Sequence, residues 1–179
     1  MKGIIFTEFL ELVEAKFGLE TVDEIIEKSV LKSNGIYTSI GTYEFHEMLQ
    51  LLQHLSSKTK ITIDNLLLVY GEHLFKVLKD SYPGLVESYN DPIEMLSSIE
   101  DHIHVEVRKI YPDAELPTFV VKEKTENSLV MIYKSNRAMH HFGLGLINKT
   151  FEHFNSSASI ILEKIKDDGT EVKFIINKN

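Results

Sequence analysis

The spacing of apolar residues changes at Pro117, and this change constrains the fold more than any other feature of the sequence. Before Pro117, apolar residues recur every three or four positions, which is the period of an amphipathic helix. After it, β-branched and aromatic runs at 119–121 and 129–133 are typical of strands. No linker rich in Gly, Pro and Ser separates the two parts, and 179 residues can bury one substantial core. The sequence therefore predicts a single α+β domain.

Caps and turns divide these two parts into elements. The helix that begins at Asp91-Pro92 has the clearest start, because Asp is a good N-cap and Pro favours the first helical position. The other helices are expected over residues 3–17, from a capping box at Thr21 to Val30, from Thr42 to about 57, from Thr62 or Asp64 to Asp80, and over 138–154. Four strands at 119–121, 129–133, 159–165 and 171–176 predict a small antiparallel sheet with an inserted helix.

Charge and composition narrow the classes of partner and compartment. The chain has 19 Lys and Arg against 27 Asp and Glu, a formal charge of −8, which argues against nucleic acid as a partner. It has no cysteine, so disulfides and thiolate metal sites are excluded. The apolar run at 4–6 is too short for a signal peptide, and no long apolar span follows. We therefore expect a cytoplasmic protein that does not contact a membrane.

Familiar enzyme motifs are missing from the sequence. There is no P-loop, no dinucleotide fingerprint and no nucleophile elbow. His46-Glu47 opens like a zinc-protease motif, but Gln50 stands where the second histidine is needed. Asp101 and His104 have the carboxylate-x-x-His spacing of di-iron bundles, yet no second copy exists. The sequence therefore indicates a binding protein rather than an enzyme.

Two histidines flank the apolar stripe of the helix that begins at Asp91. The stripe is centred near Ile103, with His104 on one edge and His102 on the other. At about 100° per residue their imidazoles diverge, so at most one of them binds a given metal. The spacing prefers neither histidine, and a histidine on a helix is more often a surface or hydrogen-bonded side chain than a ligand.

A polar string follows the second predicted strand. Alternate residues of a strand share a face, so Tyr133, Ser135 and Arg137 are expected to present two hydroxyls and a guanidinium together. Such a set can bind a carboxylate, although it can also simply cap a turn. One imidazole, apolar walls and a carboxylate receptor together suit heme.

These residues also carry a family resemblance. The opening run 1–6, the segment from His104 through Tyr111-Pro112 to Pro117, and Tyr133-x-Ser135-x-Arg137 resemble the heme nitric oxide/oxygen binding (H-NOX) family over essentially the whole chain, in its stand-alone bacterial form. The resemblance implies a helical N-terminal subdomain over 1–60, a subdomain over 61–179 that holds the ligand helix and the sheet, and ferrous heme b between them.

The resemblance also implies roles for particular residues. His104 becomes the proximal ligand of the heme iron, and Pro117 presses on the porphyrin and bends it. The propionates are held by Tyr133, Ser135 and Arg137, and the distal side is lined by Ile5, Phe9, Leu74, Phe142 and Leu146.

The residue at position 142 bears on gas selectivity. H-NOX proteins that hold O2 stably have a tyrosine five residues after the arginine, where this chain has Phe142. Bound O2 gains from a hydrogen-bond donor far more than NO or CO does. The resemblance therefore implies a sensor that binds NO and CO, excludes O2, and signals through a weakened His104–iron bond to a separate protein, by family habit a histidine kinase or a diguanylate cyclase.

Two rival functions remain at the level of sequence. One is a heme-free module that binds a small ligand or a protein and regulates a kinase. The other is a small heme enzyme, which is disfavoured because the expected pocket offers no acid or base unless His73 or His141 turns inward. The missing cysteines also exclude the cysteine-ligated zinc site of some bacterial relatives.

Overall fold

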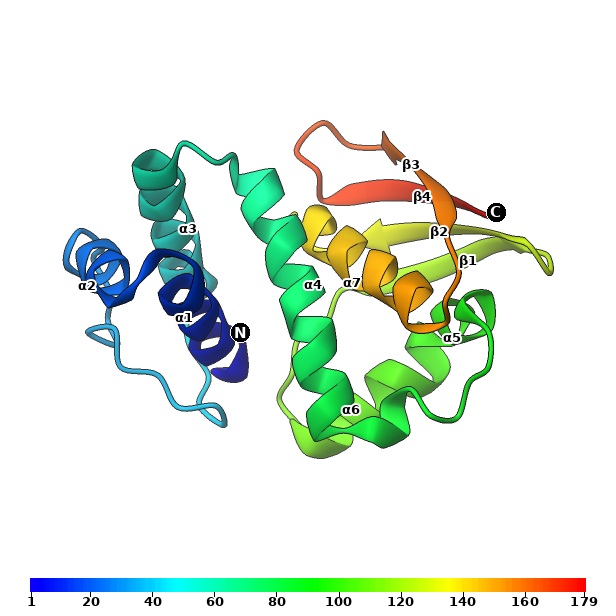
Figure 1. Ribbon diagram of the computed structural model, residues 1–179, viewed down its shortest axis with the longest axis horizontal. Helices are drawn as coiled ribbons and strands as arrows, with labels where there is room; N and C mark the ends of the chain where they lie inside the picture. The colour runs from blue at the N-terminus through cyan, green and yellow to red at the C-terminus, as the bar shows by residue number, and fades with distance from the viewer.

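Three helices form one end of the molecule, and a fourth separates them from a sheet (Figure 1). The structure is a computed structural model that describes residues 1–179. The helices of the first end are α1 (Ile4–Phe17), α2 (Leu19–Glu27) and α3 (Phe45–Thr59), and the separating helix is α4 (Ile63–Ser81). A short 3₁₀ turn (Pro83–Leu85) follows α4. No helix combines the length and the apolar character that a membrane-spanning segment requires.

The sheet consists of four antiparallel strands in the order β1-β2-β4-β3. Its two hairpins are β1 (Thr118–Lys124) with β2 (Ser128–Lys134), and β3 (Ala158–Lys164) with β4 (Glu171–Lys178). Helix α7 (His140–His153) connects the hairpins and lies between the sheet and α4 (Figure 1). The expected α+β class, with a helix inserted into a small antiparallel sheet, is confirmed. Cross-strand pairing carries the strands beyond the apolar runs that predict them.

Caps decide where two helices begin. The Thr62 hydroxyl accepts a hydrogen bond from the Asn65 backbone N–H, as expected for the N-cap of α4. The capping box expected at Thr21 is wrong, since α2 already begins at Leu19 and the Thr21 hydroxyl donates to the Phe17 carbonyl. Gly18, with φ 84°, reverses the chain so sharply that α2 follows α1 without a linker.

The segment after Asp91 is three helical pieces instead of the one helix expected. Asp91 Oδ1 accepts from the N–H groups of Ile93 and Glu94, which confirms the helix start. The pieces are α5 (Pro92–Ser97), a single π-helical turn (Ile99–Ile103) and α6 (His104–Ile110). In the π-turn the Ser98 carbonyl accepts from the N–H groups of both His102 and Ile103. The extra residue rotates everything after it relative to a continuous helix.

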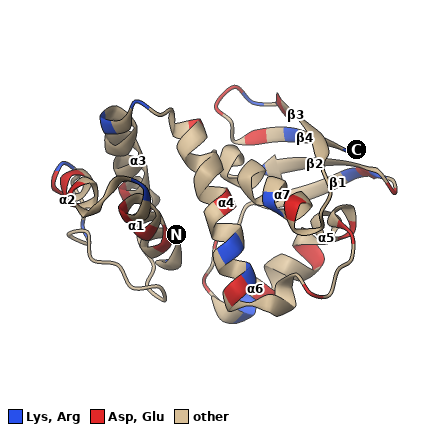
Figure 2. Cartoon of the chain, viewed as in Figure 1, with Lys and Arg blue, Asp and Glu red and all other residues tan.

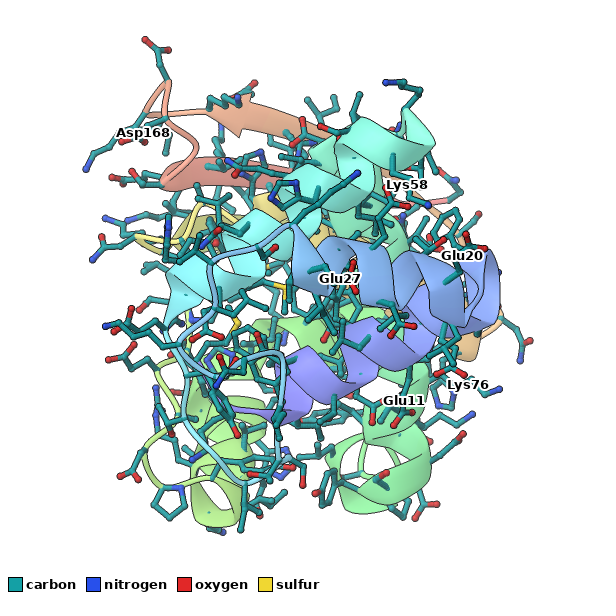
Figure 3. The ribbon with its side chains drawn as sticks, turned by 90° about the vertical axis from the view of Figure 1, so that its left-hand side faces the viewer. Glu11, Glu20, Glu27, Lys58, Lys76 and Asp168 are labelled. Atoms are coloured by element: carbon teal, nitrogen blue, oxygen red, sulfur yellow. The ribbon has the colours of Figure 1, made fainter.

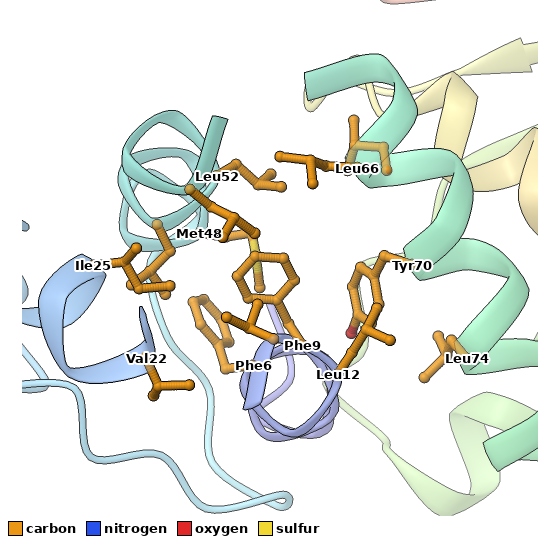
Figure 4. Packing of buried hydrophobic residues seen from close by; sticks show 14 of the residues in the cluster. Phe6, Phe9, Leu12, Val22, Ile25, Met48, Leu52, Leu66, Tyr70 and Leu74 are labelled. Atoms are coloured by element: carbon orange, nitrogen blue, oxygen red, sulfur yellow. The ribbon is translucent and has the colours of Figure 1, made fainter. Parts of the chain in front are cut away.

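The molecule has two main apolar cores and a smaller buried cluster that includes Phe75 of α4. The first packs α1, α2 and α3 against one side of α4 around Phe6, Phe9, Met48 and Tyr70, as Figure 4 shows. The second lies between the sheet and the segments that cover it, and includes Ile93, Leu129, Phe151 and Phe174. The crossing of α4 with α7 is close because it uses glycine. A Cβ added to Gly145 would stand 2.1 Å from the Leu68 carbonyl oxygen, and one added to Gly71 would stand 2.1 Å from that of Phe142.

In the cartoon of Figure 2, Lys and Arg positions lie among Asp and Glu positions along the helices and strands. The end of the molecule built by the N-terminal helices carries Glu11, Glu20 and Glu27 on its surface (Figure 3). This distribution agrees with the net charge of −8, which does not favour a polyanion as partner.

Candidate functional site

An apolar cavity of about 250 Å³ lies between the first turn of α1, the crossing of α4 with α7, and the α5–α6 segment. Hydrophobic residues make up 22 of the 30 that line it. No group of three or more His, Asp or Glu side chains in the molecule could hold a metal ion. A metal in this cavity therefore has to bring most of its ligands with it.

His104 is the histidine that lines the cavity, whereas His102 does not. The π-turn produces this difference, because the rotation it introduces points position 104 inward. His102 Nδ1 is hydrogen-bonded to the Tyr89 hydroxyl at 2.5 Å, and Tyr89 in turn accepts from Ser98 Oγ at 2.6 Å. His102 is therefore occupied in a polar network beside the cavity.

The surroundings of His104 prepare its imidazole to bind a metal. The residue is 8% exposed, and its Nδ1 lies 3.1 Å from Glu100 Oε1. Because a carboxylate only accepts hydrogen bonds, Nδ1 carries the proton and the Nε2 lone pair stays free. Burial lowers the pKa of His104 even though the Glu100 charge opposes the shift. A neutral imidazole with an unoccupied Nε2 is the form that a metal binds.

Tyr133, Ser135 and Arg137 all reach one edge of the cavity, which we call the rim. They do not do so by strand alternation, because β2 ends at Lys134 and the next residues form a turn. Ser135 Oγ accepts from the Arg137 N–H at 3.2 Å, which bends the chain there. Tyr133 Oη accepts from the Met139 N–H at 2.9 Å. Burial raises the pKa of Tyr133, so its hydroxyl keeps a proton to donate.

The Arg137 guanidinium already binds a carboxylate. Its Nη1 donates to the Glu115 carbonyl at 2.7 Å, and its Nη2 donates to Glu115 Oε2 at 2.5 Å. The Glu115 side chain is 80% exposed while that of Arg137 is 17% exposed. An ion pair with so exposed a partner contributes little to stability, so a carboxylate from a ligand in the cavity can replace Glu115.

The side of the cavity opposite His104, which we call the distal wall, is apolar. It is built by Ile5 of α1, Leu74 of α4, and Phe142 and Leu146 of α7, all of which line the cavity. The expectation that Phe9 lines it is wrong. One turn further along α1, the Phe9 ring faces away from the cavity and packs 5.4 Å from the ring of Tyr70 in the N-terminal core (Figure 4).

Polar groups near the distal wall are all directed elsewhere. Tyr70 donates to the Ile5 carbonyl at 2.5 Å, and His73 pairs with Glu8 at 3.3 Å. His141 Nδ1 lies 3.3 Å from Asp64 Oδ1. The side chains of Tyr70, His73 and His141 do not line the cavity. The Thr150 hydroxyl of α7 does, but it donates to the Leu146 carbonyl at 2.9 Å, so the distal wall offers a ligand no free side-chain donor.

The side that carries His104, which we call the proximal wall, contains residues that sequence reasoning missed. Glu100 stands four residues before His104, a spacing that could have indicated a helical neighbour. The Pro117 predicted to press on a cofactor does line the cavity, beside Leu116. An apolar slot with one free imidazole and a cationic rim fits heme, whose faces are apolar and whose edge carries two carboxylates.

Comparison with known proteins points to the same cofactor. The family model described as Haem-NO-binding matches residues 2–162. The comparison with curated proteins gave no match.

Solved structures match along the whole chain. The unliganded Fe(II) H-NOX protein from K. algicida is 79% identical, with a TM-score of 0.98 over all of this chain and 97% of that one. The H-NOX from Shewanella woodyi in the Fe(II)CO state is 37% identical, with a TM-score of 0.83 over 100% and 95%. The H-NOX protein from S. oneidensis in the Fe(II)NO state is 26% identical, with a TM-score of 0.91 over 100% and 99%.

Proposed function

This chain belongs to the Haem-NO-binding (H-NOX) family of heme-binding domains, and we propose that it is a sensor of NO and CO that excludes O2. We take the cofactor to be heme b in its ferrous state, which supplies an iron position that a diatomic gas can occupy. The observation that carries the proposal is the contrast across one cavity: a free imidazole on the proximal wall, a carboxylate receptor at the rim, and no donor on the distal wall.

Each group of residues has a distinct part in holding the cofactor. His104 would give its Nε2 to the iron, and Arg137, Ser135 and Tyr133 would bind the propionates. Pro117 would contact the porphyrin. In a chain of net charge −8, the guanidinium of Arg137 supplies the local positive charge that two carboxylates need.

Gas selectivity follows from what Phe142 and its neighbours lack. Bound O2 carries partial negative charge that a donor stabilises, whereas NO and CO depend on a donor far less. Ile5, Leu74, Phe142 and Leu146 offer only hydrocarbon. The same absence of an acid or base argues against peroxidase-like chemistry, so we propose binding rather than catalysis.

Signalling depends on the bond between His104 and the iron. If NO weakened or broke this bond, His104 would be free to move with the segment that carries it. Residues 1–60 touch the cavity mainly through the start of α1, so we expect them to shift as a subdomain relative to residues 61–179. A separate signalling protein, a histidine kinase or a diguanylate cyclase, would read this shift.

Absorption spectra of the purified ferrous protein, before and after one equivalent of NO, test the proposal. We expect a heme spectrum that changes coordination with NO in the wild type, and loss of heme or of that change in His104→Gly. His102→Gly is the matched control, because His102 stands two residues away but does not line the cavity. It loses the hydrogen bond to Tyr89, but we expect it to keep both the heme and the NO-dependent change in coordination. A colourless wild-type protein would favour the heme-free interaction module instead, and a normal NO response in His104→Gly would transfer the ligand role to another residue.

A further inference from the structure

The Glu100 carboxylate joins two of the segments that surround the cavity. Its Oε1 accepts from His104 Nδ1 at 3.1 Å and also from the backbone N–H of Phe119 at 2.7 Å. Glu100 lies in the π-turn, while Phe119 lies in β1, two residues after Pro117. The Phe119 ring is itself 6.2 Å from the His104 ring. One oxygen atom therefore ties the imidazole to the strand beside it.

Glu100 differs from the neighbouring acid in a way that indicates a specific role. Asp101 is exposed and makes no hydrogen bond, as expected for an ordinary surface carboxylate. The Glu100 side chain is 30% exposed, and one of its oxygens makes both hydrogen bonds. Holding the Phe119 N–H alone would account for one bond to that oxygen. The second bond is made to the single N–H of the neutral His104 ring. It therefore fixes Nε2 as the nitrogen that is left free.

We propose that Glu100 is a positioning residue that orients His104 and strengthens it as a ligand of the iron. An ionised acceptor draws on the Nδ1 proton and raises the electron density at Nε2. Glu100 thereby stabilises ferric over ferrous iron and slows the release of His104 when NO binds. This inference rests on the proposed function, since it requires iron at His104.

The substitution Glu100→Gln isolates the charge, because glutamine keeps the shape and one oxygen acceptor. In the heme-loaded protein we expect the midpoint potential to rise by about 59 mV, equivalent to a tenfold change in the ferric-to-ferrous balance. We expect the iron–imidazole stretching frequency to fall in resonance Raman spectra. After one equivalent of NO, conversion from six- to five-coordinate heme should be roughly tenfold faster. Effects of such second-layer residues commonly lie between about 10-fold and 100-fold, and we expect the smaller effect because Glu100 is partly exposed.

Asp101→Asn is the matched control, since it removes an equal charge from the same turn without touching His104. We expect its potential and stretching frequency to stay close to those of the wild type. The inference is overturned if heme-loaded Glu100→Gln keeps both wild-type values, or if Asp101→Asn shifts them equally.

A second variant covers the case in which Glu100→Gln folds but takes up no heme. Glu100→Asp keeps the charge and is one methylene too short to bond both donors. Heme uptake with a raised potential in this variant supports the inference, and a wild-type potential contradicts it. Failure of the proposed function can be distinguished from failure of this inference, because the wild-type protein itself would then show no heme spectrum.

Discussion

The proximal and distal walls of the cavity face each other but are held in place by different kinds of interaction. The proximal wall rests on directed polar bonds: the Asp91 cap, the network of Ser98, Tyr89 and His102, and the two bonds of Glu100. The distal wall rests on apolar packing and on the close glycine crossing of α4 with α7. Directed bonds fix the orientation of one imidazole, whereas apolar packing excludes polar groups without orienting any.

This difference suits the part proposed for each wall. A metal ligand works only if its ring is held at a defined angle, and second-layer hydrogen bonds supply that constraint. A wall that discriminates against O2 does so by providing no hydrogen-bond donor, so it needs only to exclude water and polar groups. Substitutions that add a donor to the distal wall, loosen its packing, or remove a polar bond of the proximal wall or the rim test this comparison.

The largest effect is expected at the rim, where the two walls meet. Arg137→Met removes the guanidinium without changing either wall and should weaken heme binding by about 3 kcal/mol, roughly 100-fold, because two charge-assisted bonds are lost. The rate of heme transfer to apomyoglobin measures this. Glu115→Gln removes only the competing carboxylate, so we expect it to hold heme at least as well as the wild type. Equal heme loss from the wild type and Arg137→Met would exclude Arg137 as a propionate ligand.

The next effect comes from giving the distal wall a donor. Phe142→Tyr places a hydroxyl beside the gas site and should stabilise bound O2 by about 2 kcal/mol, roughly 30-fold in affinity. Absorption spectra of the ferrous protein in air, compared with spectra under argon, report an oxy complex. Phe142→Leu is the control, since it changes shape without adding a donor. A stable oxy complex in the wild type would contradict the proposed exclusion of O2.

A third substitution tests the packing of the distal wall. Gly145→Ala brings a methyl group to 2.1 Å from the Leu68 carbonyl, so α7 must move away from α4. We expect a loss of about 1–3 kcal/mol in the free energy of unfolding, measured by chemical denaturation. Gly143→Ala, on the same helix, meets only Phe119 Cζ at 3.5 Å and Phe174 Cζ at 4.0 Å, which are ordinary contacts, and should be neutral or stabilising. Equal stability of the two variants would show that the crossing tolerates separation.

The smallest effect is expected from the cap of the proximal wall. Burial alone would raise the pKa of Asp91, but hydrogen bonds from Lys178 and from the Glu94 and Ile93 N–H groups hold it below its ordinary value. Asp91→Ala should cost about 1 kcal/mol at neutral pH.

The pH dependence of this cap has a definite sign. A lowered pKa in the folded state stabilises the fold above the ordinary aspartate pKa of about 4, and this contribution is lost as the pH falls through the folded-state pKa. Denaturation of wild type and Asp91→Ala from pH 7 downward should therefore show curves that converge below about pH 4. Asp91→Asn keeps a capping oxygen, so it should lose less free energy of unfolding at pH 7 than Asp91→Ala does. A difference that is constant with pH would show that the charge of Asp91 does not contribute.

Local sequence determined most of the secondary structure. The Asp91-Pro92 start, the Thr62 cap and the β1–β2 hairpin all follow from residues close together in the chain, since capping and turn formation are short-range interactions. His104, Tyr133, Ser135, Arg137 and Phe142, the residues that carry the resemblance, line one cavity.

Tertiary structure alone decided which side chains enter the cavity. The periodicity of residues 91–110 left His102 and His104 equivalent, and the π-turn separated them. Alternation along a strand gave the wrong reason for the rim, because Ser135 and Arg137 lie in a turn beyond β2. Phe9 was assigned to the cavity and belongs to the N-terminal core. In each case the direction of a side chain depends on contacts with elements distant in sequence, and these contacts outweigh the fraction of a kcal/mol that separates local alternatives.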